Sequence, residues 1–118
     1  MRKLGILILS LLSINVYANS HRVTQIANNK VHVWETTIEP SSAHKIKMHH
    51  HNFDRVVVAL DNGTLKIVND HGKVHYLKLQ KDKSYYLKKD VGRELHTDEN
   101  MGRHPIKVIV VELSSPDH

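Results

Sequence analysis

One stretch decides the fold: Val-Val-Val-Ala-Leu-Asp-Asn-Gly, residues 56–63. Its first five residues form a continuous apolar run rich in β-branched side chains, which is typical of a buried strand. The Asp-Asn-Gly sequence that follows is a strong tight-turn signal, because asparagine and glycine tolerate the backbone angles of such turns. We therefore expect a buried strand here that forms a hairpin with residues 64–68.

Further strand-like runs lie on both sides of this segment. They are short and are separated by turn residues such as Pro40 and Gly72. The runs are residues 31–38, 46–51, 73–79, 84–87 and 106–113, of which the last is the clearest. No segment of a dozen residues has convincing helical periodicity. Short strands at this spacing predict an all-β domain, either a sandwich or a barrel.

The first 18 residues have the layout of a cleaved secretory signal. Arg2 and Lys3 supply a basic start, residues 4–12 are nearly all apolar, and Val16 and Ala18 are the small residues of a cleavage site. The apolar run is shorter than the roughly 20 residues of a membrane helix. We therefore expect a cleaved signal (1–18), one domain (19–118) and export to the periplasm or medium, without stable membrane insertion. The alternatives are an uncleaved amphipathic first strand or helix and an uncleaved anchor.

Composition argues against several function classes. The 118-residue chain has 17 Lys and Arg against 12 Asp and Glu, and loss of the predicted signal would reduce the 17 to 15. These basic residues are scattered, so the concentrated basic surface of a nucleic-acid-binding protein is not expected. The sequence has no motif for nucleophilic catalysis or for phosphate or dinucleotide binding. It also has no cysteine, so a metal site would have to use His, Asp, Glu or Asn.

Histidine is the residue type that points to chemistry. The chain has 11 histidines, and three of them are consecutive at His49, His50 and His51, with His96 and Asn100 much later in the chain. Imidazoles at this spacing are poor material for an apolar core and good material for a metal site on strands. The plainer interpretations are a solvated loop for the triplet and a core or turn histidine, satisfied by backbone, for His96.

Strand alternation leaves two choices for the ligands in the triplet. In an unbroken strand His49 and His51 share one face, whereas Met48 and His50 share the other. A bulge near Met48, or irregular backbone at the histidines, would let His49 and His51 face the interior. The second choice uses His50 with Asp54 as a carboxylate ligand, but it would place the soft, weak thioether of Met48 in the site.

The chain resembles a small, exported, single-domain cupin. The first cupin motif is Gly-(x)5-His-x-His-(x)3,4-Glu-(x)6-Gly. His49, His51 and Gly63 match its two histidines and its closing glycine. In this register Ala43 stands at the leading glycine position and Val56 at the glutamate position.

The second cupin motif, Pro-x-Gly-x-x-His-x-x-x-Asn, is matched by His96 and Asn100. Val91 and Arg93 replace its proline and glycine. Together the two motifs extend the resemblance over about residues 31–113. It implies an all-β fold of the cupin-type jelly roll, also called a double-stranded β-helix barrel.

The resemblance implies a divalent metal ion held by His49, His51 and His96, without the usual glutamate. Three neutral imidazoles could hold Fe, Zn, Ni, Mn or Cu, so the identity of the metal stays open. Some cupin thiol dioxygenases also use three histidines, but that likeness concerns ligand number alone. Four residues are candidates for supporting the site or replacing a ligand: His44, His50, Asp54 and Asn100.

Several of the neighbouring polar residues have plainer interpretations. Asn100 is better suited to tying down a loop by hydrogen bonds than to touching a ligand. Asp98 and Glu99 suit a solvated edge, although either could act as an acid or base beside a metal-bound water. Asp54 and Arg55 suit a surface ion pair, which contributes little to stability.

The sequence therefore predicts one bound divalent metal ion and a small-molecule ligand. Two functions fit: a metal-dependent enzyme, such as a dioxygenase or isomerase, and a non-enzymatic ligand- or metal-binding module of the periplasm. A purely structural domain is the third hypothesis, in which His49→Ala and His96→Ala would leave metal content and stability unchanged. A homodimer is also compatible with the sequence, because a long apolar strand at residues 106–113 needs a neighbour or cover.

Overall fold

The computed structural model describes residues 20–41 and 48–114. The predicted signal therefore lies outside the described residues. Eight strands follow one another: β1 (Ser20–Ala27), β2 (Val31–Ile38), β3 (Arg55–Ala59), β4 (Gly63–Asn69), β5 (Val74–Leu79), β6 (Ser84–Leu87), β7 (His96–Asn100) and β8 (Ile106–Leu113). Within the described ranges, no helix has the length and apolar character needed to cross a membrane.

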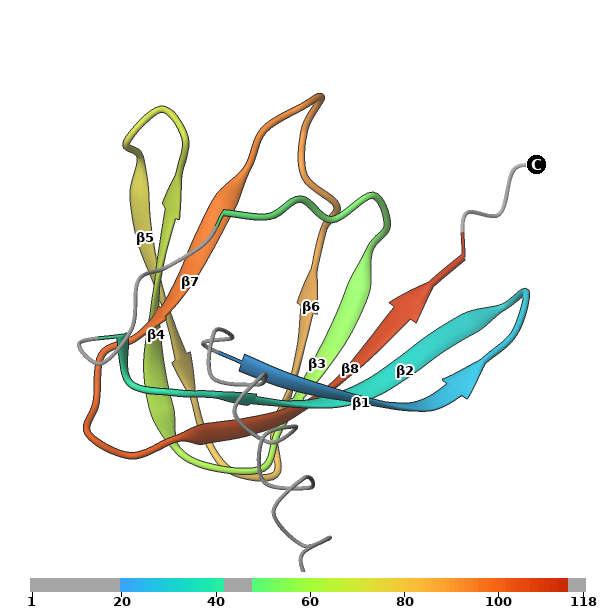
Figure 1. Cartoon of the computed structure of the whole chain (residues 1–118), viewed down its shortest axis with the longest axis horizontal. Helices are drawn as coiled ribbons and strands as arrows, with labels where there is room; N and C mark the ends of the chain where they lie inside the picture. The colour runs from blue at the N-terminus through green and yellow to red at the C-terminus, as the bar shows by residue number, and fades with distance from the viewer. Residues whose placement is uncertain (1–19, 42–47, 115–118) are drawn as a thin grey trace, which may run out of the picture.

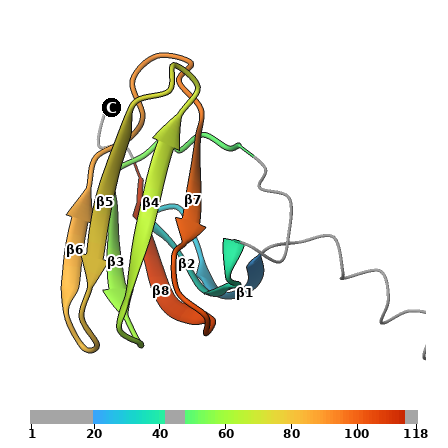
Figure 2. The same ribbon diagram turned by 90° about the vertical axis from the view of Figure 1, so that its left-hand side faces the viewer.

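Two antiparallel sheets form the domain. One has five strands in the order β1-β2-β8-β3-β6, and the other has three in the order β5-β4-β7. Figure 1 shows the two sheets facing each other, with the β1–β2 hairpin extending away from the smaller sheet. Figure 2 shows the smaller sheet from its outer side, with β4 between β5 and β7. The prediction of an all-β fold is confirmed.

The turn after β3 does not make the predicted hairpin. β3 pairs with β8 and β6, whereas β4 pairs with β5 and β7. The chain therefore passes from one sheet to the other at residues 60–62. Gly63 lies very close to β8, since a Cβ atom at this position would be 2.7 Å from Cγ1 of Ile106. A glycine here lets β4 start against the opposite sheet, a close approach that a hairpin would not require.

Most predicted strands are confirmed, but two strands were not predicted. β2, β6 and β8 have the predicted limits. β1 has no apolar alternation to reveal it, because residues 21–27 are exposed on both faces. β7 consists of polar residues only. The described part of the predicted strand 46–51 contains only an isolated bridge between His49 and His96. The irregular backbone that was one of the two expected ways to turn His49 and His51 toward the interior is therefore present.

β8 lies inside the five-stranded sheet, between β2 and β3. The neighbours that this strand was expected to need are β2 and β3 of the same chain, which pair with both of its edges. A homodimer stays a prediction, but the apolar strand at residues 106–113 no longer supports it.

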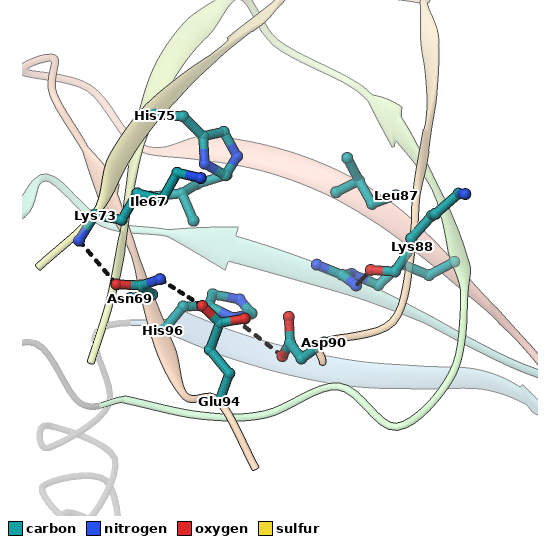
Figure 3. Close-up of a pocket in the computed structure, with 10 residues that line it drawn as sticks. Ile67, Asn69, Lys73, His75, Leu87, Lys88, Asp90, Glu94 and His96 are labelled. Atoms are coloured by element: carbon teal, nitrogen blue, oxygen red, sulfur yellow. Dashed lines mark hydrogen bonds and ion pairs between the residues drawn. The ribbon is translucent and has the colours of Figure 1, made fainter. Parts of the chain in front are cut away.

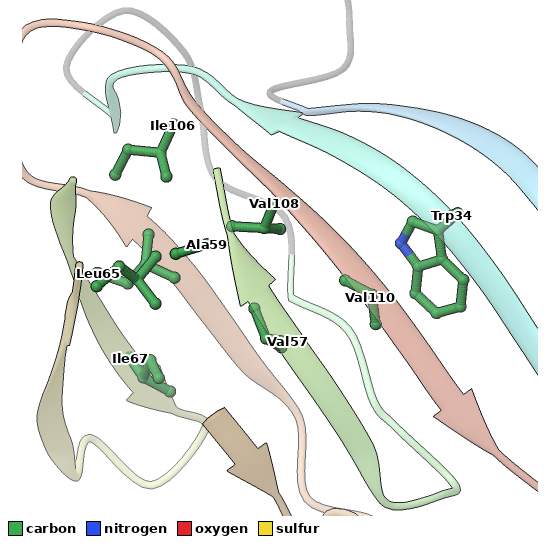
Figure 4. Packing of buried hydrophobic residues seen from close by; sticks show 9 residues of the cluster. Trp34, Val57, Ala59, Leu65, Ile67, Ile106, Val108 and Val110 are labelled. Carbon is green, nitrogen blue, oxygen red and sulfur yellow. The ribbon is translucent and has the colours of Figure 1, made fainter. Parts of the chain in front are cut away.

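The apolar core fills one end of the space between the sheets (Figure 4). Its residues come from one face each of β2, β3, β4, β5 and β8, and on β3, β4 and β8 they alternate as the two-residue period of a strand requires. The buried cluster consists of Trp34, Val57, Ala59, Leu65, Ile67, Leu79, Ile106, Val108 and Val110. On β3 the same inward face continues from Ala59 and Val57 to Arg55. The other end of the interior is therefore polar.

Candidate metal centre

Four side chains from two segments converge at this polar end. His49 and His51 come from the segment before β3, and His96 and Asp98 come from β7. One ligand atom from each lies within 4.8 Å of the other three. Asp98 is central, because its oxygens lie 3.2 Å from Nε2 of His49 and 3.6 Å from Nε2 of His96. The structure thus brings the three predicted histidines together and adds a carboxylate.

Backbone pairing positions these side chains. His49 and His96 exchange two N–H···O=C hydrogen bonds, each of 2.8 Å. This bridge holds the histidine triplet against β7. On β7, His96 and Asp98 share a face because residues two apart in a strand point the same way. That spacing is the signal that could have identified Asp98, had β7 been recognised as a strand.

Asp90 orients the ring of His96. Its Oδ2 lies 3.1 Å from Nδ1 of His96 and accepts a hydrogen bond of 2.7 Å from the His51 N–H. A carboxylate at Nδ1 keeps the proton on that nitrogen and leaves the lone pair of Nε2 free, as in metal-binding histidines. Asp90 belongs to no motif, and nothing in the sequence pointed to it.

Nε2 of His96 has no hydrogen-bond partner. It is the buried side-chain nitrogen or oxygen that is left without one in the described part of the chain. Leaving a buried polar atom unpaired costs about 1–3 kcal/mol. This atom is directed at the Asp98 carboxylate and the neighbouring imidazoles, so a cation among the four groups would satisfy it.

The protonation states of the cluster suit metal binding. Burial, together with the charges of Arg55 and His49, lowers the pKa of His51 to about 3. Burial also lowers the pKa of His96. Burial acts to raise the pKa of Asp98, but the hydrogen bond and charge of His49 outweigh it and lower this pKa. Neutral imidazoles and an ionised carboxylate are the forms that coordinate metal ions.

The interior position expected for the motif glutamate is held by Arg55. Val56 was predicted there, but its side chain lies on the other face of β3, while Arg55 faces the interior and is 7% exposed. The motif allows three or four residues after His51, and three residues lead to Arg55, although seven residues instead of six then separate Arg55 from Gly63. The predicted surface ion pair with Asp54 is also wrong, because Arg55 is buried and its Nη1 donates to the Lys88 carbonyl at 3.2 Å.

His50 and Asp54 lie outside the cluster. The carboxylate of Asp54 accepts hydrogen bonds from the Tyr86 hydroxyl and from the Lys89 N–H, which use both of its oxygens. Nδ1 of His50 contacts the carbonyl of Glu94. The structure therefore does not form the alternative in which His50 and Asp54 would be ligands.

Asn100 ties loops together and is not one of the clustered groups. Its Nδ2 donates to the carbonyls of Ile38 and His104, and its Oδ1 accepts from the Gly102 N–H. This agrees with the interpretation that Asn100 secures a loop. His44 lies outside the described residues, so its supporting role stays a prediction.

A cavity of about 320 Å³ adjoins the cluster at His96. Its wall combines charged and apolar side chains, and Asp90 and His96 lie together at one end of it (Figure 3). Lys88 and Leu87 lie on the opposite side from Lys73 (Figure 3). Ligand sites in proteins begin at about this size. A small molecule could therefore reach the imidazole cluster.

One family model matches most of the chain. The model describes the C-terminal domain of mannose-6-phosphate isomerase and matches residues 13–116. The chain belongs to this family. Its domain is a small cupin, as the two motifs predicted. No curated protein sequence matches the chain.

Solved structures share the fold. A cupin domain from Bordetella pertussis Tohama I superimposes with a TM-score of 0.67 at 23% identity, over 82% of this chain and 95% of that one. A conserved protein with a double-stranded β-helix domain from Klebsiella pneumoniae superimposes with a TM-score of 0.60 at 18% identity, over 86% of this chain and 82% of that one. The structure of Fe(II)-HppE with (S)-1-HPP superimposes with a TM-score of 0.62 at 11% identity, over 80% of this chain but 49% of that one. The predicted cupin-type fold is confirmed.

Proposed function

We propose that this cupin holds one divalent metal ion through His49, His51, His96 and Asp98 and binds a small-molecule ligand beside it. The unpartnered Nε2 of His96 carries the proposal. It is buried, its ring is held by Asp90, and it faces three other ligand atoms within 4.8 Å.

The donor set fits a divalent transition metal. Imidazole nitrogens suit Fe, Zn, Ni and Cu, and a carboxylate oxygen suits these and Mn. When bound, such an ion would polarise an oxygen atom of the ligand or of water. The chain itself contributes Asp90, which keeps the proton on Nδ1 of His96, and a cavity through which a ligand reaches the ion. A dioxygenase or isomerase reaction would use this arrangement, and the non-enzymatic alternative requires binding alone.

Export remains part of the proposal. It is supported by the basic start, the apolar run and the small-residue cleavage site of residues 1–18. Mass spectrometry of the protein isolated from its native cells would test this point, with a mature chain beginning at residue 19 as the expected result. A full-length chain in the cytoplasm would contradict it.

Metal titration of the tag-free protein tests the proposal. We expect one Zn(II) per chain after dialysis against a chelator. His96→Ala should weaken zinc binding by more than about 100-fold, because loss of a supporting partner alone typically costs 10–100-fold. His75→Ala is the matched control, since His75 lines the same cavity but does not belong to the cluster. The proposal fails if no divalent metal binds stoichiometrically, or if His96→Ala and His75→Ala behave alike.

A further inference from the structure

Among the described residues, Arg55 is a largely buried cation whose guanidinium keeps N–H groups that no protein group accepts from. A guanidinium carries five N–H groups, and the structure gives Arg55 one side-chain hydrogen bond, to the Lys88 carbonyl. In the described part of the chain, no carboxylate oxygen lies within ion-pair distance of it. Its side chain is more than nine-tenths buried and lines the cavity that reaches His96. Among the described residues, the guanidinium nitrogens without a protein partner are not fully buried, so they are open to the cavity and can donate to an anionic occupant there.

The nearest acidic side chains are engaged elsewhere. Asp98 contacts His49, and Asp90 contacts His96 and the His51 N–H. Burial lowers the pKa of Arg55, and the charges of Asp98 and Asp90 oppose this change. Because arginine stays protonated in proteins, the cavity keeps a permanent positive charge beside the imidazole cluster.

The charges of the cavity wall favour a ligand with one negative charge. The wall has one more cationic than anionic side chain, counting Arg55, Lys73 and Lys88 against Asp90 and Glu94. A monoanion would balance this excess, whereas a phosphate dianion would also face two carboxylates. A carboxylate matches the planar guanidinium through two parallel hydrogen bonds. Ile67 and Leu87, in the same wall, offer apolar contacts to the remainder of a ligand.

We propose that Arg55 anchors the carboxylate of a small monocarboxylate in this cavity, with the other end of the ligand directed toward His96. The inference names the ligand class for the proposed metal centre and rests on that function for its metal. The contact with Arg55 does not itself require the ion. Binding can therefore be measured with and without metal.

An NMR titration of the ¹⁵N-labelled, tag-free protein with sodium lactate tests the proposal. Lactate should shift the Nε–Hε signal of Arg55 saturably in both the metal-free and the zinc-loaded protein. Sodium phosphate should bind more weakly, and sodium chloride at equal ionic strength should have no saturable effect. The signal is assigned by its loss in Arg55→Gln.

Two variants separate the buried guanidinium from general charge. Arg55→Gln should weaken lactate binding at least about tenfold, because it removes one partner of a buried charge pair. Lys88→Gln removes a cation from the same wall but keeps the carbonyl that accepts from Arg55, and it should weaken binding less than about threefold. If Arg55→Gln does not fold, Arg55→Lys takes its place, because it keeps the charge but loses the two parallel hydrogen bonds, and it should also bind lactate more weakly than the wild type.

Three results would overturn the proposal: no saturable binding of lactate, equal affinity in a folded Arg55 variant, or tighter binding of phosphate than of lactate. A chain that takes up zinc but not lactate contradicts this inference alone. A chain that binds lactate through Arg55 but takes up no metal contradicts the proposed metal centre alone.

Discussion

The two ends of the space between the sheets both contain buried side chains but differ in what holds these side chains in place. Ile106 and Ala59 at the apolar end are 2% and 0% exposed, and His96 at the polar end is 4% exposed. Apolar packing has no direction and tolerates residues of similar volume. Buried imidazoles and charges need partners in a particular geometry. The apolar end therefore provides stability, whereas the polar end gathers the side chains of the proposed metal centre.

Ile106→Ala should have the largest effect, a loss of about 2–5 kcal/mol in the free energy of unfolding. Ile106 packs in the apolar core and contacts the start of β4 at Gly63. Urea unfolding of the metal-free protein measures this loss. Ile109→Ala, on the opposite and half-buried face of the same strand, should lose less. Equal losses would contradict the placement of the core on the Ile106 face.

At the apolar end, the limits of the strands could be predicted from the sequence, but the pairing between the strands could not. β8 and β2 are rich in β-branched residues, so their limits could be predicted from local pattern. The partners of β3 depend on contacts with β8 and β6, far away along the chain. The local turn signal at residues 61–63 favoured a hairpin, and long-range pairing overrode it.

Asp90→Asn should have the next largest effect, on metal affinity. Asp90 holds the proton on Nδ1 of His96, and loss of such a partner typically costs 10–100-fold in affinity. Competition with a chelator measures zinc affinity. Glu94→Gln is the control, because Glu94 lines the same cavity but its carboxylate accepts a hydrogen bond from Asn69. Unchanged affinity in Asp90→Asn would mean that the polar end does not depend on this carboxylate.

The polar end could be predicted only in part. Spacing and the cupin resemblance identified His49, His51 and His96. Asp98 could be recognised as a member of the cluster only if β7 were known to be a strand, and β7 has no apolar residues that would indicate a strand. Arg55 required the alternation of β3, because the motif spacing before Gly63 places Val56 at the glutamate position. Such sites are set by orientation in three dimensions, which local sequence patterns do not encode.

Acidification should destabilise the metal-free protein through its polar end. The pKa of His51 is about 3 in the folded chain and 6.5 in a free histidine. Below pH 6.5 the unfolded chain takes up a proton that the folded chain does not, so stability present above pH 6.5 is lost as the pH falls toward 3. These two pKa values correspond to a loss of about 2 kcal/mol by pH 5, and because His51 is only partly buried we expect roughly 1 kcal/mol.

Urea unfolding of the wild type and of His51→Gln, at pH 7 and at pH 5, measures this contribution. The wild type should lose more stability than the variant over this interval. If both lose the same amount, His51 is not held neutral by the fold.

Asp54→Asn should have the smallest effect on the metal centre. Asp54 lies outside the cluster and bonds to Tyr86 and Lys89. We expect zinc affinity to stay within about twofold of the wild type, since an exposed charge has only a weak, screened effect on a distant site. The same chelator competition measures this. A loss as large as that of Asp90→Asn would make Asp54 a ligand after all.

A crystal structure of the zinc-loaded protein, with anomalous diffraction at the zinc edge, tests the central claim most directly. We expect one anomalous peak per chain, about 2.0–2.3 Å from a nitrogen of His49, His51 and His96 and from an oxygen of Asp98. The absence of a peak among these four side chains would contradict it. So would a peak only at the exposed group of Asp70, His71 and Glu94.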